Sequence, residues 1–253
     1  MTPAPGVLWL TGASAGIGRA LALRLARDGW RVAASARRDG ELAALQAEAH
    51  GLPGEVRPYP LDVTDATAVA ACVAAIEREM GPIDLAILNA GTHKPMPAGQ
   101  FSAATLRALM EINLFGVAHG LEALLPRMIA RGRGRVALVA SLAGYSGLPS
   151  AAAYGASKAA LINLAEAMRP ELRANGVVLQ VINPGFVRTP LTAKNDFPMP
   201  FLIDAADAAE AIRRGLMSDR FEIAFPWLFA RLMKLLRALP YRLFFLLTQR
   251  LVR

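Results

Sequence analysis

The sequence predicts an α/β fold, a doubly wound parallel sheet with helices on both faces. Short apolar runs alternate with longer segments of helical spacing over most of the chain, and this alternation is typical of a parallel sheet. The first apolar run ends in a Gly-rich turn, directly before a helical segment. The 253 residues, 54% of them hydrophobic, are enough for one large domain with a sizeable core.

Each predicted element follows from an apolar run and from the residues that end it. Gly81-Pro82 separates a helix from a buried strand, and Asn175-Gly176 ends a later helix. The predicted strands are residues 7–10, 31–35, 56–61, 85–88, 135–140, 177–182 and 221–225, and the predicted helices are 17–27, 41–49, 66–79, 103–131 and 154–174. We expect about seven strands in one domain over residues 1–225, with a helical extension over 226–253.

Cysteine and charge content restrict the compartment and the partners. Cys72 is the single cysteine, so no disulfide can form within the chain, as is typical of a reducing compartment. Residues 1–6 lack the regions of a signal peptide, and we expect a cytoplasmic protein. Residues 220–253 contain seven Lys or Arg and one acid, Glu222, and therefore hold +6 of the net charge of +8. The rest is nearly neutral, which argues against nucleic-acid binding.

A glycine-rich turn over residues 11–18 lies between the first strand and the first helix. Gly12 allows a tight turn, and Gly16 and Gly18 let a cofactor and the helix approach closely, so that free N–H groups of the helix face a pyrophosphate. The spacing is GxxxGxG rather than the commoner GxGxxG. The position and the three glycines favour a dinucleotide site over an ordinary strand-to-helix turn.

The end of the second strand predicts which dinucleotide binds. An acidic residue at this place commonly holds a ribose 2′-hydroxyl, but here Arg37 and Arg38 follow Ser35-Ala36. Two guanidinium groups suit a 2′-phosphate, which favours NADP over NAD. The alternative is that both arginines belong to a solvated helix start.

Tyr154 and Lys158 lie four residues apart, so a helix places both side chains on one face. The ordinary pKa of tyrosine is about 10, and a neighbouring cation lowers it. We therefore expect Lys158 to lower the pKa of Tyr154, so that the phenol can give or take a proton while a hydride moves.

Taken together, these residues resemble the short-chain dehydrogenase/reductase family over roughly residues 5–225. The matching motifs are Thr11 to Gly18, Asp62-Val63, Asn89-Ala90-Gly91, Asn113, Ser141, Tyr154 with Lys158, and Pro184-Gly185 through Thr189. The resemblance implies a single Rossmann-like domain, a nicotinamide cofactor and a homo-oligomer, either a dimer or a tetramer.

The resemblance also implies four catalytic residues. Tyr154 would be the general acid in carbonyl reduction and the base in alcohol oxidation, and Lys158 would hold the nicotinamide ribose. Ser141 would hydrogen-bond the substrate oxygen. Asn113, inside the long helix, would support a water that relays protons to Lys158.

The same resemblance places the cofactor. Asp62 would bind the adenine amino group beside the Val63 backbone, residues 89–91 would lie along the cofactor and steady the sheet, and Thr189 would lie near the carboxamide. The full set of expected cofactor contacts is Gly12, Ser14, Gly16, Ile17, Gly18, Arg37, Arg38, Asp62, Val63, Asn89, Ala90, Gly91, Tyr154, Lys158, Pro184, Gly185, Val187 and Thr189.

The histidines and the cysteine have no metal-ligand spacing, so we expect no metal site. His50, His93 and His119 are predicted to be structural, and Cys72 to pack in an amphipathic helix. His93 follows the Asn89-Ala90-Gly91 motif, so the alternative for this residue is that it lines the substrate cleft.

The last part of the chain departs from the family pattern. Residues 197–202 are a candidate apolar lid, which indicates an apolar substrate or simple packing on the body. After Pro226, Arg231, Lys234 and Arg237 form one stripe among Trp and Leu residues, and Pro240 begins a second helix. No run here reaches the ~18 apolar residues of a membrane span. The pattern is typical of an interfacial helix on an anionic membrane, and a helix pair that packs on the domain or on another subunit explains it equally well.

The sequence therefore predicts an NADP(H)-dependent oxidoreductase that interconverts an alcohol and an apolar or lipid-like carbonyl. A 3-oxoacyl-thioester reductase is the second enzyme hypothesis. A cofactor-binding regulatory or scaffold protein without catalysis is the rival from another class, and the intact catalytic set argues against it.

Overall fold

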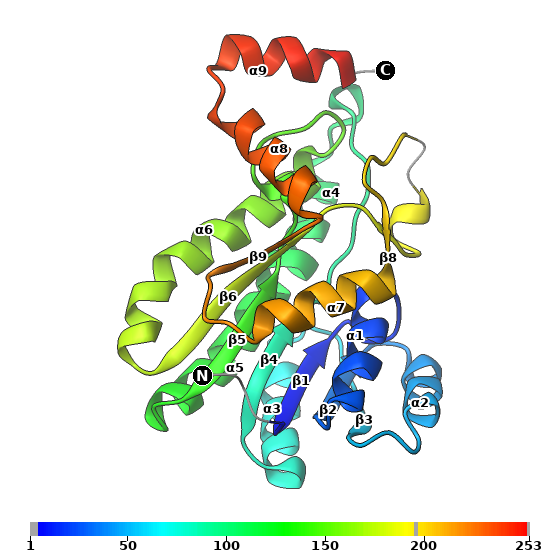
Figure 1. Cartoon of the computed structure of the whole chain (residues 1–253), viewed down its shortest axis with the longest axis vertical. Helices are drawn as coiled ribbons and strands as arrows, with labels where there is room; N and C mark the ends of the chain where they lie inside the picture. The colour runs from blue at the N-terminus through cyan, green and yellow to red at the C-terminus, as the bar shows by residue number, and fades with distance from the viewer. Residues whose placement is uncertain (1–4, 195–196, 252–253) are drawn as a thin grey trace.

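A seven-stranded parallel sheet forms the centre of the computed structural model, which describes residues 5–194 and 197–251 (Figure 1). The strands are β1 (Val7–Thr11), β2 (Arg31–Ala36), β3 (Glu55–Pro60), β4 (Ile83–Leu88), β5 (Gly134–Val139), β6 (Val177–Pro184) and β9 (Glu222–Phe225), in the order β3-β2-β1-β4-β5-β6-β9. This order confirms the predicted fold class. Strands are added first on one side of β1 and then on the other, so a ligand crevice is expected beyond the C-terminal ends of β1 and β4.

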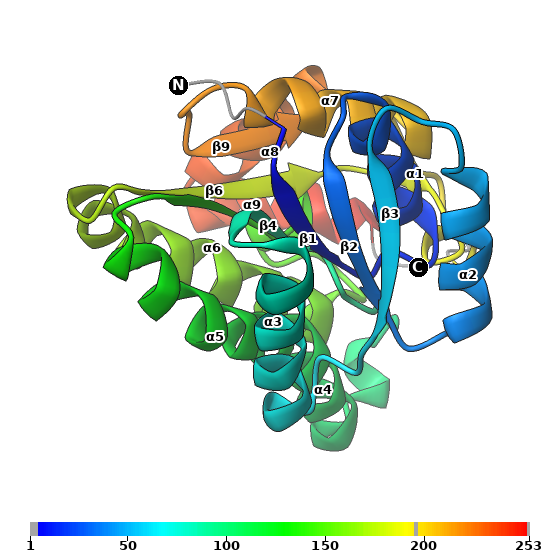
Figure 2. The same ribbon diagram turned by 90° about the horizontal axis from the view of Figure 1, so that it is seen from below.

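Helices cover both faces of the sheet (Figure 2). One face carries α1 (Gly16–Arg27), α2 (Asp39–Glu48) and α7 (Ala205–Leu216); the other carries α3 (Ala66–Met80), α4 (Ala103–Met110), α5 (Gly116–Ala130) and α6 (Ala152–Ala174). Alternate residues of β1 point to opposite faces, so Leu8 and Leu10 pack with α1 and α7 while Trp9 packs with α3 and α5. All three side chains are fully buried.

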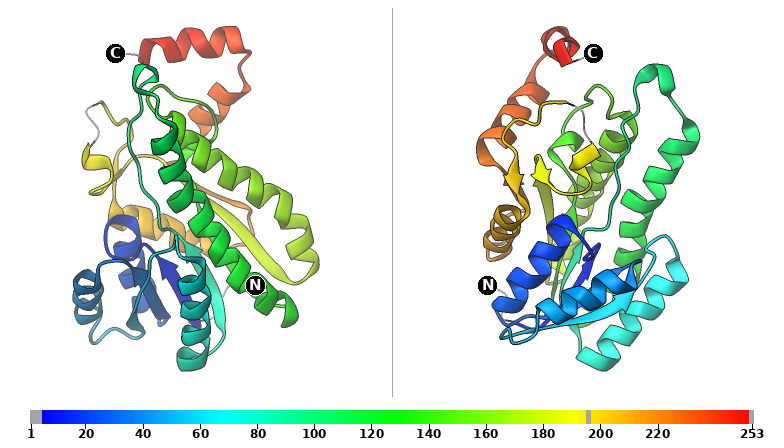
Figure 3. Two further views of the ribbon diagram at one scale, coloured as in Figure 1. Left: turned by 180° about the vertical axis from the view of Figure 1, so that it is seen from behind. Right: turned by 90° about the vertical axis from the view of Figure 1, so that its right-hand side faces the viewer.

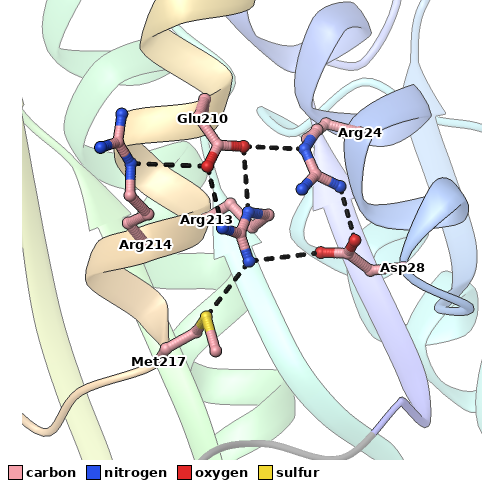
Figure 4. Close-up of polar contacts among 6 residues, drawn as sticks. All are labelled: Arg24, Asp28, Glu210, Arg213, Arg214 and Met217. Atoms are coloured by element: carbon pink, nitrogen blue, oxygen red, sulfur yellow. Dashed lines mark hydrogen bonds and ion pairs between the residues drawn. The ribbon is translucent and has the colours of Figure 1, made fainter.

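An ionic cluster joins α1 to α7 at the surface (Figure 4). Arg24 contacts Glu210 at 2.8 Å and Asp28 at 2.5 Å, and Arg213 contacts the other Glu210 oxygen at 2.8 Å. The hydrogen bond from Arg213 lowers the pKa of Glu210 to about 2, with a further contribution from Arg24. The cluster ties α1, whose first turn is part of the glycine-rich segment, to the C-terminal half of the domain.

The predicted helix over 103–131 is present, but a π-helical turn interrupts it. Glu111–Phe115 forms this turn between α4 and α5. A π turn carries extra residues per turn and often occurs at functional sites, and Asn113 lies at its middle. Ala103–Ala130 is also long and apolar enough to cross a membrane by length and composition alone; here it packs against α3 and α6 within the domain.

β6 is longer than predicted. The sequence suggested an end at Ile182, but the strand continues through Pro184 because Asn183 and Pro184 pair with Ala224 and Phe225 of β9. After β6 come a small two-stranded sheet, β7 (Val187–Arg188) with β8 (Ile203–Asp204), and short 3-10 turns over Ala98–Gln100, Leu142–Gly144, Thr192–Lys194 and Gln249–Leu251.

Two helices at the C-terminus, α8 (Trp227–Ala238) and α9 (Tyr241–Thr248), extend beyond the body of the domain (Figure 3). β9 is parallel to β6, so α8 starts at the C-terminal edge of the sheet. Ala230 and Met233 of α8 are buried in the main core. Both predicted helices are therefore present; Arg253, counted with the basic tail, lies outside the described residues.

Candidate active site

The ends of β1 and β4 are joined by side-chain hydrogen bonds. The Thr11 hydroxyl oxygen accepts from the backbone N–H of Asn89 at 2.9 Å and of Ala90 at 3.0 Å. The Asn89 amide donates in return to the carbonyls of Thr11 at 3.0 Å and Gly12 at 3.2 Å. These four bonds fix the glycine-rich turn against residues 89–91, as the sequence led us to expect for Asn89.

Two glycines of the turn lie where any side chain would collide with neighbouring atoms. Gly12 has φ +68°, and a Cβ on it would lie 2.8 Å from the Ala90 Cα. A Cβ on Gly18 would lie 2.3 Å from the Gly12 carbonyl oxygen, so only glycine lets α1 approach this closely. No side chain among the described residues caps the N-terminus of α1 at Ala15. Its first N–H groups are those that would hold a pyrophosphate.

Two arginines lie beside this turn, each near another residue of the predicted cofactor set. Arg38 donates to the Ser14 hydroxyl at 3.2 Å, so the start of α2 reaches across to the glycine-rich turn. Arg37 helps to lower the pKa of Asp62, although hydrogen bonds from Thr64 are the main cause. Both guanidinium groups are exposed.

Tyr154 lies in the first turn of α6, and Ser141 follows β5. The Ser141 hydroxyl oxygen accepts from the Ala143 N–H at 3.1 Å, and its O–H is 3.4 Å from the Pro184 carbonyl oxygen. Burial raises the pKa of Tyr154, and a hydrogen bond with Ser141 only partly offsets that rise. The expected lowering of the Tyr154 pKa by Lys158 is therefore wrong, because desolvation of the phenolate dominates.

Lys158 is buried beneath Tyr154, with its Nζ 5.8 Å from the centre of the tyrosine ring. The ammonium group donates to the Val139 carbonyl at 2.8 Å. Burial lowers the pKa of Lys158 to about 8. A Cβ on Gly91 would lie 3.3 Å from the Asn113 amide oxygen and 3.4 Å from the lysine nitrogen, so the loop after β4 passes close to both groups.

Asn113 is fully buried and holds the neighbouring loop to α6. Its amide oxygen accepts from the Thr92 N–H at 2.7 Å, and its amide nitrogen donates to the Thr92 carbonyl at 3.0 Å. The same nitrogen donates to the Ser157 hydroxyl at 2.9 Å, and Ser157 donates to the Tyr154 carbonyl at 2.7 Å. Asn113 is thus linked through Ser157 to the backbone of Tyr154.

The predicted segment after β6 lies between the glycine-rich turn and the tail. The Gly185 N–H donates to the Phe225 carbonyl at 2.7 Å, and Val187 is buried. Thr189 lies against Gly16: a Cβ on that glycine would be 3.0 Å from the Thr189 methyl group. Pro184 through Thr189 therefore borders the same crevice as the α1 N-terminus.

His93 contacts the candidate general acid, a position to which the sequence gave little weight. Its ring meets the Tyr154 ring edge-on, with centroids 4.7 Å apart and an interplanar angle of 69°. His119 fits the structural prediction, because its ring bonds the Val63 carbonyl at 2.9 Å, whereas the exposure of His50 leaves its predicted role a prediction. Thr92 and Ser157 were also missed, because their contacts join segments far apart in the sequence.

Among the described residues, no three His, Cys, Asp or Glu side chains cluster as a metal site would require.

The observed arrangement suits a dinucleotide. Glycines keep the crevice floor free of side chains, α1 offers uncapped N–H groups, and Tyr154, Ser141 and Lys158 stand at the C-terminal edge of the sheet. A hydroxyl pair beside a lysine can donate to a carbonyl oxygen and exchange a proton with it. The fold and site together define a nicotinamide-dependent oxidoreductase.

The chain belongs to the short-chain dehydrogenase family, whose model matches residues 7–198. It is 43% identical over 235 residues to an uncharacterized oxidoreductase of Myxococcus xanthus, with 93% of each chain covered. It is 34% identical over 188 residues to the 3-oxoacyl-(acyl-carrier-protein) reductase FabG of Thermotoga maritima, covering 74% of this chain and 76% of that one. A short-chain dehydrogenase/reductase of Burkholderia phymatum in complex with NAD has a TM-score of 0.85 at 25% identity, covering 93% and 94% of the two chains.

Proposed function

We propose that this chain is an NADP(H)-dependent oxidoreductase that interconverts a carbonyl and an alcohol, with Tyr154 as general acid and base. The observation that carries the proposal is the grouping of Tyr154, Ser141 and Lys158 at one edge of the sheet, beside the glycine-rich crevice. A bound nicotinamide would supply or accept the hydride. Ser141 and Tyr154 would donate to the substrate oxygen, and Tyr154 would transfer its proton.

The protein's own residues set the protonation of this site. A tyrosine phenol is protonated at neutral pH, and burial raises the pKa of Tyr154 further, which suits a proton donor in carbonyl reduction. Lys158, with a pKa of about 8, is mostly charged at pH 7 and would favour the phenolate once the proton has left. Asn113 would act as a positioning residue through Ser157.

Replacing Tyr154 with Phe tests this proposal. We expect Tyr154→Phe to lose most turnover, measured as NADPH oxidation with a panel of carbonyl compounds, while NADPH still quenches the protein fluorescence on binding. Near-normal turnover in the variant would refute the role of Tyr154. If the wild type binds NADPH but does not oxidise it in the presence of any carbonyl in the panel, the hypothesis of a non-catalytic scaffold protein replaces this proposal.

Arg37 and Arg38 support NADP as the cofactor. Arg38 bonds Ser14 at the glycine-rich turn, and Arg37 lies near Asp62, so two cations border the expected ribose position. A 3-oxoacyl-thioester reductase remains the second candidate activity, and the similarity to the Thermotoga maritima enzyme favours it.

An apolar substrate is supported by an aromatic stack between the candidate lid and the tail. Phe186 lies 5.8 Å from Phe197 and 5.7 Å from Phe229 of α8, and Phe229 lies 5.5 Å from Phe201, measured between ring centroids. Phe197 and Phe201 of the candidate lid thus pack on Phe186, in the segment that follows β6, and on α8. The preference should appear as a rise in kcat/KM with the length of the carbonyl's apolar chain.

We also propose that residues 226–253 contact an anionic membrane surface in the cytoplasm. Trp227 and Leu235 are both 65% exposed, and Arg231 lies 5.3 Å from the Trp227 ring centre. This pairing of aromatic and basic groups is typical of interfacial helices. In sedimentation assays, phosphatidylserine vesicles should pellet the full chain, phosphatidylcholine vesicles should not, and Trp227→Ser with Leu235→Ser should abolish pelleting. Equal pelleting of this double variant and the wild type would contradict membrane binding through the tail.

A homo-oligomer, a dimer or a tetramer, is the remaining proposal. The apolar helix α4–α5 leaves Phe115 47% and Ile129 39% exposed, which suits a helix face that is covered by a second copy. Light scattering after size-exclusion chromatography should give a mass of two or four chains, and Phe115→Glu should lower it. A monomer at micromolar concentration contradicts the proposal.

A further inference from the structure

A groove of about 820 Å³ lies between the tail and the loop that follows Ser141. Residues 145–149 form one wall, and Leu239, Tyr241, Phe244 and Phe245 contribute to the other. Its volume is within the range of small-molecule sites. The loop wall connects Ser141, at its start, to Tyr154, just after its end, so the groove adjoins the segment that bears two candidate catalytic residues.

The tail wall is aromatic and held by ring contacts. Tyr241 and Phe245 stack with centroids 5.7 Å apart and 16° between their planes, and Phe244 meets Phe245 edge-on at 5.3 Å. Phe244 is buried, whereas Tyr241 and Phe245 are 79% and 58% exposed. A surface of this kind gains free energy when an apolar ligand covers it.

One cation stands among these apolar groups. Arg237 of α8 lines the groove, and it makes no ion pair with a carboxylate in the part of the chain that the structure describes. The neighbouring Lys234 differs, because Glu222 neutralises it. A guanidinium group without a carboxylate partner is suited to bind a carboxylate or a phosphate group of a ligand.

The loop wall leaves room for a chain. Gly147 is exposed, and a Cβ added to it would meet no atom within 4 Å. The φ angle of Gly147 is not positive, so a residue with a side chain can adopt the same backbone conformation. Gly147 lines the groove, so the space along this wall is where an apolar chain would run.

We propose that this groove binds an anionic amphiphile, with its apolar chain between the aromatic wall and Gly147 and its acidic group on Arg237. The apolar lining selects the chain, and the cation selects a fatty acid or an acyl conjugate over a neutral lipid. Two ligands share this chemistry: the substrate's own acyl chain, which rests on the proposed function, and a separate lipid from the membrane surface.

Binding of cis-parinaric acid, a fluorescent fatty acid, to the full-length protein tests the proposal without any turnover. Arg237→Gln should weaken binding about tenfold, the scale of one charge-assisted hydrogen bond, and should leave binding of the corresponding neutral alcohol unchanged. Gly147→Leu fills the groove and should weaken both ligands at least tenfold. Arg173→Gln and Gly40→Leu, exposed changes on other helices, should match the wild type.

Wild-type affinity in both Arg237→Gln and Gly147→Leu would overturn the proposal, as would equal losses in the control variants. Circular dichroism and thermal midpoints verify that the variants fold. A kinetic arm then separates the two ligands. If the chain belongs to the substrate, Gly147→Leu raises KM for long-chain carbonyls and not for short ones. If a separate lipid binds, KM is unchanged while parinaric acid affinity falls. The parinaric acid assay measures binding alone, so its result does not depend on whether Tyr154 catalyses turnover.

Discussion

The hydroxyl of Tyr145 donates a hydrogen bond to the carboxylate of Glu222, which joins the segment after Ser141 to the edge strand β9. Glu222 also accepts from the Asn183 amide at 2.8 Å and pairs with Lys234 of α8. Burial raises the pKa of Glu222, but hydrogen bonds from Lys234, Tyr145 and Asn183 outweigh it and hold the pKa below its ordinary value. One carboxylate thus connects the loop that follows Ser141, the end of β6 and the tail.

Glu222→Gln should therefore lower the free energy of unfolding by about 1–2 kcal/mol at pH 7, since the amide keeps the shape but loses the ion pair and the charged hydrogen bonds. The folded pKa of Glu222 is depressed, so its stabilisation is present above the unfolded pKa of about 4.3 and is lost as the pH falls through the lower folded pKa. Urea unfolding of both proteins at pH 7 and pH 3 measures this.

Glu122→Gln, an exposed change on α5, is the matched control and should alter stability by less than about 0.5 kcal/mol. A gap between wild type and Glu222→Gln that is as large at pH 3 as at pH 7 would assign the loss to packing rather than to charge.

Local patterns in the sequence were enough to predict the sheet, the glycine-rich turn and the Tyr154–Lys158 pair. Strand ends and glycines act over a few residues, and the four-residue spacing fixes one helix face. The continuation of β6 to Pro184 was not predictable in this way, because its pairing with β9 depends on a strand about forty residues later. The contact of His93 with Tyr154 likewise depends on how two distant loops fold together.

The charge state of the site could be predicted only in part. Spacing alone suggested that Lys158 lowers the pKa of Tyr154, but the burial of both groups is a tertiary property and it dominates. The tail illustrates the same point: its helices follow from periodicity and proline positions, whereas the groove with Arg237 depends on the placement of α8 and α9 beside residues 145–149.

Arg38 should contribute more to NADP binding than to NAD binding. Its guanidinium group stands at the Ser14 hydroxyl, beside the expected 2′-phosphate. We expect Arg38→Ala to weaken NADP binding about tenfold to a hundredfold, the scale of one or two charge-assisted hydrogen bonds, and to leave NAD binding within about twofold. Fluorescence titration with both dinucleotides measures the ratio. Arg107→Ala, an exposed change on α4, is the control. A parallel loss for NAD and NADP would disprove recognition of the phosphate by Arg38.

Asn113 should matter for stability as well as for turnover. Asn113→Ala leaves both backbone groups of the half-buried Thr92 without their side-chain partner. Each unsatisfied group costs about 1–3 kcal/mol, so the thermal midpoint should fall by roughly 4–12 °C in a chain of this size. Calorimetry measures the shift. Asn175→Ala removes one bond, 2.9 Å to the Glu171 carbonyl, on the exposed end of α6 and should shift the midpoint far less. Equal shifts in the two variants would contradict the structural role of Asn113.

Lys158→Met should abolish activity yet stabilise the fold at neutral pH. Burial lowers the pKa of Lys158 to about 8, so the charged form is less favourable in the folded protein than in the unfolded chain, where the pKa is about 10.4. The unfolded state binds more protons between these two values, so wild-type stability rises with pH across this window and carries the full penalty below pH 8. Methionine removes the charge but loses the hydrogen bond to the Val139 carbonyl, which leaves a net gain of about 2 kcal/mol. Urea unfolding at pH 7 and pH 10 should show this advantage at pH 7 and a smaller one at pH 10. If the stability gained by Lys158→Met grew with pH, the pKa of Lys158 would have to be raised by folding rather than lowered. If the variant were less stable than the wild type at pH 7, the ammonium group would stabilise the fold.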